Sequence, residues 1–136
     1  GLSGELKEGD ILTSEDNYYM TFRPGQKIFL YVAQIDTAGA IYRIFPNSDF
    51  SELRNPLNPG KEYRFPEKDY FFLDNNKGKE HVFMIASENG IKEIENFFVK
   101  LSSGDDLQRK QIAVEFKAVY EQQLNKDKDT IWFWHK

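Results

Sequence analysis

The stretch KIFLYVAQIDTAGAIYRIFPN, residues 27–47, decides the fold. Its first part, residues 28–35, is apolar at almost every position and rich in β-branched and aromatic side chains. A strand with one face in water would alternate between apolar and polar residues, so this segment predicts a strand that is covered on both faces or central in a sheet. We therefore expect the rest of the domain to be built around it.

A turn and a second strand follow this segment. Residues 36–39 supply turn chemistry, and Gly39 offers a positive φ without steric cost. Residues 40–45 then read as a strand, and Pro46 ends the pairing because proline has no amide hydrogen to donate. The whole stretch predicts a hairpin at the centre of a β-rich domain.

Other segments predict further strands and a helical part. The strands are expected at residues 17–22, 62–65, 70–73, 80–86 and 130–135, with a turn at 125–129 before the last one. Residues 91–101 place apolar side chains at helical spacing. Residues 106–124 fit both a helical stripe and a strand face, and their length and their EQQLNK end favour a helix.

These elements predict a mainly β fold, an antiparallel β-sandwich with one or two added C-terminal α-helices. We expect a single domain over residues 1–136, with a C-terminal helical insertion at about 90–125 and a closing strand at 130–135. The helices are expected to pack on an edge or a face of the sandwich.

Composition excludes several kinds of site. The 136-residue chain has no cysteine, which excludes disulfides, thiolate metal sites and a cysteine nucleophile. Its net charge of -4 gives no reason to expect nucleic acid as a partner, because nucleic acid requires a basic face. The longest apolar run, residues 28–33, is far shorter than the ~20 residues of a membrane helix, so we expect no membrane span.

Two groups of residues are candidate sites. Near the exit of the predicted hairpin and in the loop after it lie Asp36, Arg43, Asn47, Arg54 and Asn55. These polar side chains either line a pocket for a ligand or partner, or tie the long loop down through hydrogen bonds to its backbone, and we favour the second interpretation.

The second group is the pair Trp132 and Trp134, which stand two residues apart and therefore share one face of the last predicted strand. The favoured interpretation is a strand that closes the core or meets a partner. The alternative is a pair of exposed indoles that stack on a sugar ring.

No set of residues predicts catalysis. Glu80 and His81 are adjacent in a strand, so their side chains point to opposite faces and do not form a dyad. The other histidine, His135, lies at a chain end that we expect to fray. Two histidines placed in this way do not form a metal pair. We therefore expect no catalytic residue, no metal site and no cofactor.

Several short motifs occur in a fixed order along residues 9–101. They are Phe22-x-Pro24, Leu30-Tyr31-Val32 leading to Asp36 and Gly39, Phe45-Pro46-Asn47, Asn55-Pro56-Leu57 with Pro59-Gly60, Phe65-Pro66, Gly78-x-Glu80 and Ile85-Ala86-Ser87. As an ordered set they resemble a bacterial family, the domain of unknown function 4384. The part of the chain from Gly104 onward departs from this pattern.

The resemblance implies an immunoglobulin-like β-sandwich module, appended to other domains or carried by exported and envelope proteins, with no established activity. We therefore expect a non-catalytic accessory or recognition domain that binds a protein partner or an adjoining domain. A glycan-binding module with exposed aromatics is the alternative, and a hydrolase is a third. We expect a periplasmic or cell-envelope location, with an export signal removed together with the N-terminus.

Overall fold

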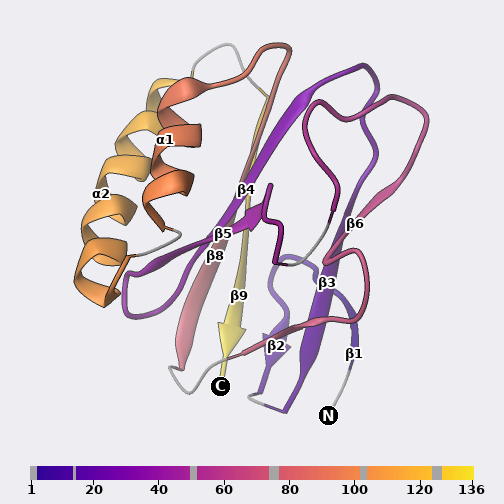
Figure 1. Ribbon diagram of the computed structural model, residues 1–136. Helices are drawn as coiled ribbons and strands as arrows, with labels where there is room; N and C mark the ends of the chain where they lie inside the picture. The colour runs from indigo at the N-terminus through magenta and orange to yellow at the C-terminus, as the bar shows by residue number, and fades with distance from the viewer. Residues whose placement is uncertain (1–2, 14, 50–51, 74–76, 102–103, 124–126) are drawn as a thin grey trace.

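The chain forms two β-sheets and two α-helices (Figure 1). The computed structural model describes residues 3–13, 15–49, 52–73, 77–101, 104–123 and 127–136. The elements, in chain order, are β1 (Ser3–Glu5), β2 (Ile11–Leu12), β3 (Asn17–Phe22), β4 (Phe29–Ile35), β5 (Ile41–Phe45), β6 (Tyr63–Phe65), β7 (Phe71–Phe72), β8 (Gly78–Ser87), α1 (Lys92–Leu101), α2 (Asp106–Gln122) and β9 (Asp127–His135). The large sheet has the strand order β2-β9-β8-β4-β5, and the small sheet has the order β1-β3-β6 with β7 beside β3.

The large sheet lies between the small sheet and the two helices (Figure 1). One cluster of buried side chains joins the two sheets and includes Tyr18 and Phe65 from the small sheet and Leu30 and Phe133 from the large one. A second cluster joins the opposite face of the large sheet to both helices. Because β4 contributes to both clusters, the expectation that residues 28–35 are covered on both faces is confirmed.

The predicted central hairpin is also confirmed. β4 pairs antiparallel with both β5 and β8. In the turn, Gly39 has φ +87° and donates its amide hydrogen to the Asp36 carbonyl at 3.0 Å. A positive φ is readily adopted by glycine, so Gly39 fits this position.

Both helices form in the segments for which the sequence predicts a helix, residues 91–101 and 106–124. α1 buries Ile94, Phe98 and Leu101 against the large sheet. α2 resolves the ambiguity of residues 106–124 in favour of a helix, and its start carries a capping box. The Asp105 carboxylate accepts from the Gln108 amide at 2.9 Å, and the Gln108 side chain accepts from the Asp105 amide at 3.2 Å. This reciprocal cap satisfies amide groups that a helix start otherwise leaves without partners.

The last strand is longer than the sequence predicts. β9 begins at Asp127, so the expectation that the turn extends through 129 is wrong for 127–129, while 125 and 126 lie outside the described residues. β9 pairs with β8 along its whole length, from Asp127 opposite Ala86 to His135 opposite Gly78. Backbone pairing to a long neighbour extends the strand into charged residues that carry no strand pattern of their own.

Two ladders depart from the antiparallel arrangement. β1 pairs parallel with β3, and β2 pairs parallel with β9, so the sheets are mixed. The chain passes from the small sheet to the large sheet at β2 and returns at β3, and a parallel pair requires such a crossover in place of a hairpin. Within the ranges described above, no helix is long and apolar enough to cross a membrane.

Candidate functional site

The structure brings four of the five predicted polar residues to one groove. Arg43, Asn47, Arg54 and Asn55 line a hollow of about 840 Å³ between α1 and the loop that follows β5. We call it the α1 groove. Phe29, Leu53, Glu95, Phe98 and Val99 also line it, so apolar and charged side chains meet there.

The two asparagines of the α1 groove hold the loop in place. The Asn55 side chain accepts from the Leu30 amide and donates to the Leu30 carbonyl, both at 2.9 Å. Asn47 is buried, donates to the Arg43 carbonyl at 3.1 Å and accepts from the Asp49 amide at 3.0 Å. The tie-down interpretation is therefore confirmed for Asn47 and Asn55, and their amides form a fixed wall of the groove.

The two arginines are placed differently. Arg43 is half-buried and donates from Nη1 to the Phe98 carbonyl at 3.2 Å, so it attaches β5 to α1. Arg54 is exposed at the rim. Glu95, on α1, accepts a hydrogen bond from the Tyr31 hydroxyl at 2.5 Å. The groove thus presents an anchored wall, an apolar surface and an exposed cation.

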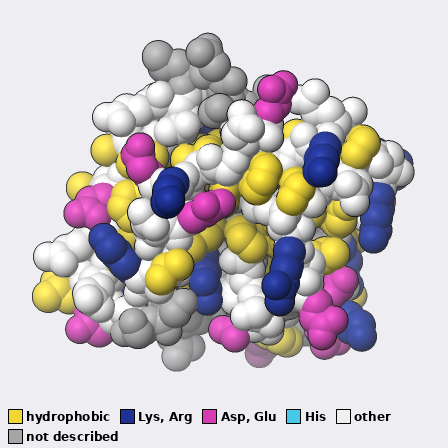
Figure 2. Space-filling model, turned by 45° about the horizontal axis from the view of Figure 1, so that its top comes forward, with side chains coloured by type: hydrophobic (Ala, Val, Ile, Leu, Met, Phe, Trp, Pro, Cys, Tyr) yellow, Lys and Arg dark blue, Asp and Glu magenta, His cyan; other side chains and the backbone are white. Residues whose placement is uncertain are grey.

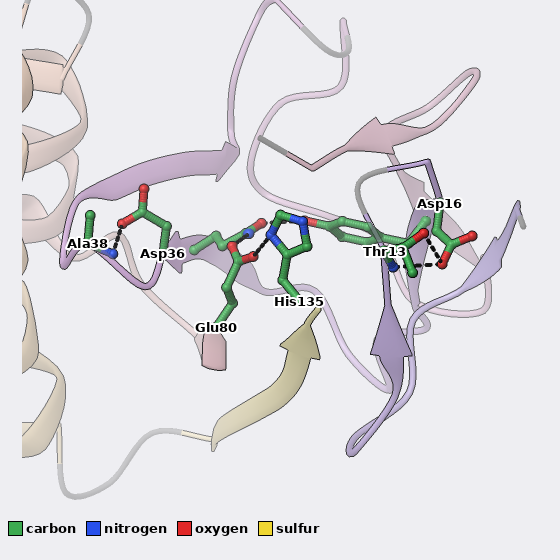
Figure 3. Close-up of polar contacts among 8 residues, drawn as sticks. Thr13, Asp16, Asp36, Ala38, Glu80 and His135 are labelled. Carbon is green, nitrogen blue, oxygen red and sulfur yellow. Dashed lines mark hydrogen bonds and ion pairs between the residues drawn. The ribbon is translucent and has the colours of Figure 1, made fainter. Parts of the chain in front are cut away.

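Asp36 lies apart from the α1 groove. It is buried in the β4–β5 turn, where its Oδ1 accepts from the Ala38 amide at 3.0 Å (Figure 3). The same oxygen accepts from the Ala40 amide at 2.9 Å. It lines a second hollow of about 260 Å³ at one end of the two sheets, together with Tyr18, Gln34, Tyr42 and Glu80. We call this hollow the sheet-end pocket.

A network of hydrogen-bonded polar side chains, which the sequence does not predict, forms part of the wall of the sheet-end pocket. His135 Nδ1 lies 3.3 Å from Glu80 Oε2, and the two side chains are 0% and 3% exposed (Figure 3). Gln34 Nε2 donates to Glu80 Oε1 at 2.7 Å, and the Tyr18 hydroxyl donates to Gln34 Oε1. The network links β3, β4, β8 and β9 inside the core. A buried carboxylate needs such partners, because moving an ion from water into the protein interior costs several kcal/mol.

The expectation that His135 lies at a frayed end is wrong, because the residue is fully buried. The alternation of side chains along the last strand indicates this burial. Ile131 and Phe133 share one face of the last strand, and His135 is the next residue on that face. In β8, Glu80 shares a face with Val82 and Met84 in the same way. Which histidine meets which carboxylate depends on the register between β8 and β9, and the sequence does not state it.

His81 points away from Glu80, as the sequence predicts. Its ring stacks on Phe83 with centroids 6.2 Å apart, and Phe83 belongs to the cluster under the helices. Burial and then the nearby charges of Lys79 and Lys117 lower the pKa of His81, because both disfavour the charged imidazole. No group of three histidine or acidic side chains suited to a metal gathers among the residues with described positions.

The tryptophan pair is only partly described. Trp132 and Trp134 both belong to β9. The Trp134 side chain is 38% exposed, with Lys79 and Lys136 ammonium groups at 6.0 Å and 5.8 Å from its ring. The Trp132 side chain lies outside the described part of the structure.

Comparison with known proteins gives one match. A family model described as a domain of unknown function (DUF4384) matches residues 12–90, more than half of the chain. No curated protein and no solved structure matches the chain. The matched range ends before α1, so the residues that line the sheet-end pocket lie inside it, whereas Glu95, Phe98 and Val99 of the α1 groove lie outside it.

Proposed function

The chain belongs to the DUF4384 family of domains of unknown function, and from this premise we propose that it is a non-catalytic recognition domain that binds a protein partner or an adjoining domain. The observation that carries the proposal is the α1 groove. It combines exposed Arg54, aromatic Phe29 and Phe98, and anchored asparagine amides in one hollow. Protein interfaces are enriched in aromatic residues and arginine and carry a polar rim.

The charge distribution supports a protein as the partner. Figure 2 shows Lys, Arg, Asp and Glu scattered among hydrophobic side chains on the face turned toward the viewer, without a large patch of one sign. The whole chain carries a net charge of -4. Nucleic-acid binding would call for a basic stripe. Mixed charges around apolar surface instead suit a partner that buries part of its own apolar surface.

We also infer that the two sheets are a variant of the immunoglobulin-like β-sandwich. The antiparallel ladders β3–β6, β4–β5, β4–β8 and β8–β9 support this inference, and the parallel ladders belong to the short strands β1 and β2. The implied use of such modules in bacterial exported and envelope proteins supports a periplasmic or cell-envelope location. Fractionation of cells that express the full-length gene product tests the location, and a product found only in the cytosol would contradict it.

The binding proposal is tested with photo-crosslinking residues placed at Arg54 and at Val99 of the full-length gene product in its own cells. Both positions line the α1 groove and are exposed. We expect both to give an adduct with the same protein, or with the same adjoining domain of the gene product. Lys68, exposed in the loop after β6, serves as a matched position outside the groove and is expected to give no such adduct.

The adduct is then checked with purified components. The partner should bind the unsubstituted domain. Arg54→Glu should weaken binding about tenfold or more, which is the loss expected when a residue that contributes strongly to an interface is replaced. Lys68→Glu makes the same change of charge elsewhere and should leave the affinity unchanged. Equal loss in both variants would indicate non-specific electrostatics, and different adducts from Arg54 and Val99 would contradict a single binding groove.

A second candidate function, glycan binding, rests on one observation, the partial exposure of Trp134. An exposed indole can stack on a sugar ring. Affinity electrophoresis in gels that contain envelope polysaccharides tests this function. Retardation that Trp134→Ala abolishes, with an unchanged melting temperature, would favour the glycan module over the protein-binding domain.

A further inference from the structure

We propose that the sheet-end pocket binds a small organic ammonium group, such as a primary amine or a quaternary ammonium head group. Among the lining residues with described positions, this site shares only Arg43 with the α1 groove, and it does not depend on the proposed protein partner. Its volume of about 260 Å³ suits one small head group, because pockets for whole drug-sized ligands begin near ~300 Å³.

The pocket has an aromatic wall. Tyr18 and Phe71 are buried in the core between the sheets, with ring centroids 5.7 Å apart, and Tyr42 is 38% exposed. Aromatic faces attract organic cations through their quadrupole, most strongly where water is excluded. Tyr42 already meets one cation, since the Arg109 guanidinium lies 4.9 Å from its ring centroid.

Two carboxylates also line the pocket, one from the β4–β5 turn and one from β8. Asp36 and Glu80 line the pocket, and each is more than nine-tenths buried, at 6% and 2% exposure. Both are fixed by the fold itself: Asp36 accepts two backbone amide hydrogens in its turn, and Glu80 is held by Gln34 and His135. An ammonium ligand would therefore meet acceptors that are already positioned and need not be ordered on binding.

The two arginines near the pocket, Arg43 and Arg109, donate their hydrogen bonds to backbone carbonyls, although the Arg109 guanidinium also lies over the Tyr42 ring. Arg43 lines the pocket, but its Nη1 donates to the Phe98 carbonyl on α1. Arg109 donates to the Ile41 and Leu101 carbonyls, also on the side of the helices. These hydrogen bonds tie both guanidinium groups to backbone carbonyls of β5 and α1.

The test uses the purified chain and three probes: choline, n-butylammonium and 3,3-dimethyl-1-butanol, a neutral molecule with the shape of choline. Binding is followed by two-dimensional NMR of the isotope-labelled chain. We expect saturable shifts with both cations at the amides of Ala38 and Ala40, which donate to Asp36, and no saturable shift with the neutral alcohol. Comparable binding of the alcohol would show a pocket that selects shape or polarity and would overturn the proposal.

Two variants separate the pocket from the rest of the surface. Asp36→Asn and Glu80→Gln each remove one charge. Asp36→Asn keeps the oxygen that accepts from both backbone amides, and Glu80→Gln keeps the oxygen that accepts from Gln34 but loses the one beside His135. Each variant should weaken choline binding about tenfold. Glu115→Gln removes an exposed charge from α2 and should leave the affinity unchanged. Melting curves show whether each variant is folded. If one carboxylate variant is unfolded, the choline affinity of the other one tests the proposal. Unchanged binding in a folded Asp36→Asn or Glu80→Gln variant, or no saturable binding of either cation to the unsubstituted chain, would overturn the proposal.

Discussion

Tyr31 shows how one side chain joins two layers of this protein. It is buried in β4, its hydroxyl donates to Glu95 on α1 at 2.5 Å, and it accepts from the Ile91 amide at 3.0 Å. Burial and then the hydrogen bond to the Glu95 carboxylate raise the pKa of Tyr31, because both disfavour the phenolate. The hydroxyl therefore connects the central strand to the start of the helical layer in its protonated form.

Tyr31→Phe tests this connection. The variant leaves the Ile91 amide without its acceptor in a buried position, so we expect a loss of about 1–3 kcal/mol in the free energy of unfolding, measured by urea titration at neutral pH. Tyr19→Phe removes a hydroxyl from the outer face of the small sheet and should cost less than about 0.5 kcal/mol. Similar losses in the two variants would show that the Tyr31 hydroxyl has no special role.

The same residue predicts a dependence on alkaline pH. The pKa of Tyr31 is higher in the folded state than its unfolded value near ~10, so the folded chain retains a proton that the unfolded chain loses. The stabilisation is complete below about pH 10 and falls as the pH rises above it. We expect the difference in unfolding free energy between the unsubstituted chain and Tyr31→Phe to shrink above that pH. A constant difference across the alkaline range would contradict the raised pKa.

Asn55 acts as a substitute for strand pairing. The ladder between β4 and β5 begins at Val32, and the Asn55 side chain makes both hydrogen bonds to the Leu30 backbone. Asn55→Ala should therefore cost about 1–3 kcal/mol of unfolding free energy, because two backbone groups at a partly buried position lose their partners. Asn58→Ala, at an exposed position of the same loop, should change stability by less than about 0.5 kcal/mol in thermal melts.

At the scale of elements, β9 is part of the large sheet although it lies at one end of the described chain. It separates β2 from β8, and it contributes the fully buried Phe133 and His135 to the core. Burial of Phe133 alone contributes roughly 1.5–3 kcal/mol, and the partly buried Ile131 adds to it. This is a substantial part of the ~5–15 kcal/mol that holds a typical domain together.

Truncation after Lys128 should therefore abolish cooperative unfolding or cause aggregation, as judged by thermal melts and size-exclusion chromatography. The truncation also leaves Glu80 without the imidazole that it contacts. Removal of Lys136 alone deletes one amide that donates to the Leu12 carbonyl and is expected to preserve a cooperative melt. A monomeric truncated chain with an unchanged melting temperature would show that β9 is an appendage.

At the scale of the whole molecule, stability should be highest where the two buried clusters meet. β4 is covered by the small sheet on one face and by the helices on the other, and it has hydrogen-bonded neighbours on both sides. We expect the Tyr31, Val32 and Ala33 amides to exchange only through global unfolding in hydrogen-exchange experiments. Amides of β2, a short edge strand, should exchange much faster. Equal exchange in β2 and β4 would contradict a central role for β4.

The sequence by itself determined the local elements. Turn residues such as Gly39 and Pro46 act on their immediate neighbours, so the hairpin could be read from residues 27–47. Apolar spacing identified α1, and the length and the EQQLNK end of residues 106–124 favoured a helix for α2. The two-sided apolar character of residues 28–35 identified the central strand. These features depend on contacts within a few residues or on a repeated burial pattern, and both are visible in one sequence.

Only the tertiary structure decided which distant residues meet. Three features follow from the path of the chain between the sheets. They are the parallel pairing of β1 with β3 and of β2 with β9, the grouping of Arg43 with Arg54 in the α1 groove, and the separation of Asp36 from Arg54. The contact between Glu80 and His135 requires the register in which Gly78 lies opposite His135. Strand order and register are set by the joint packing of all layers, and a shift of one residue would exchange the faces of the strand.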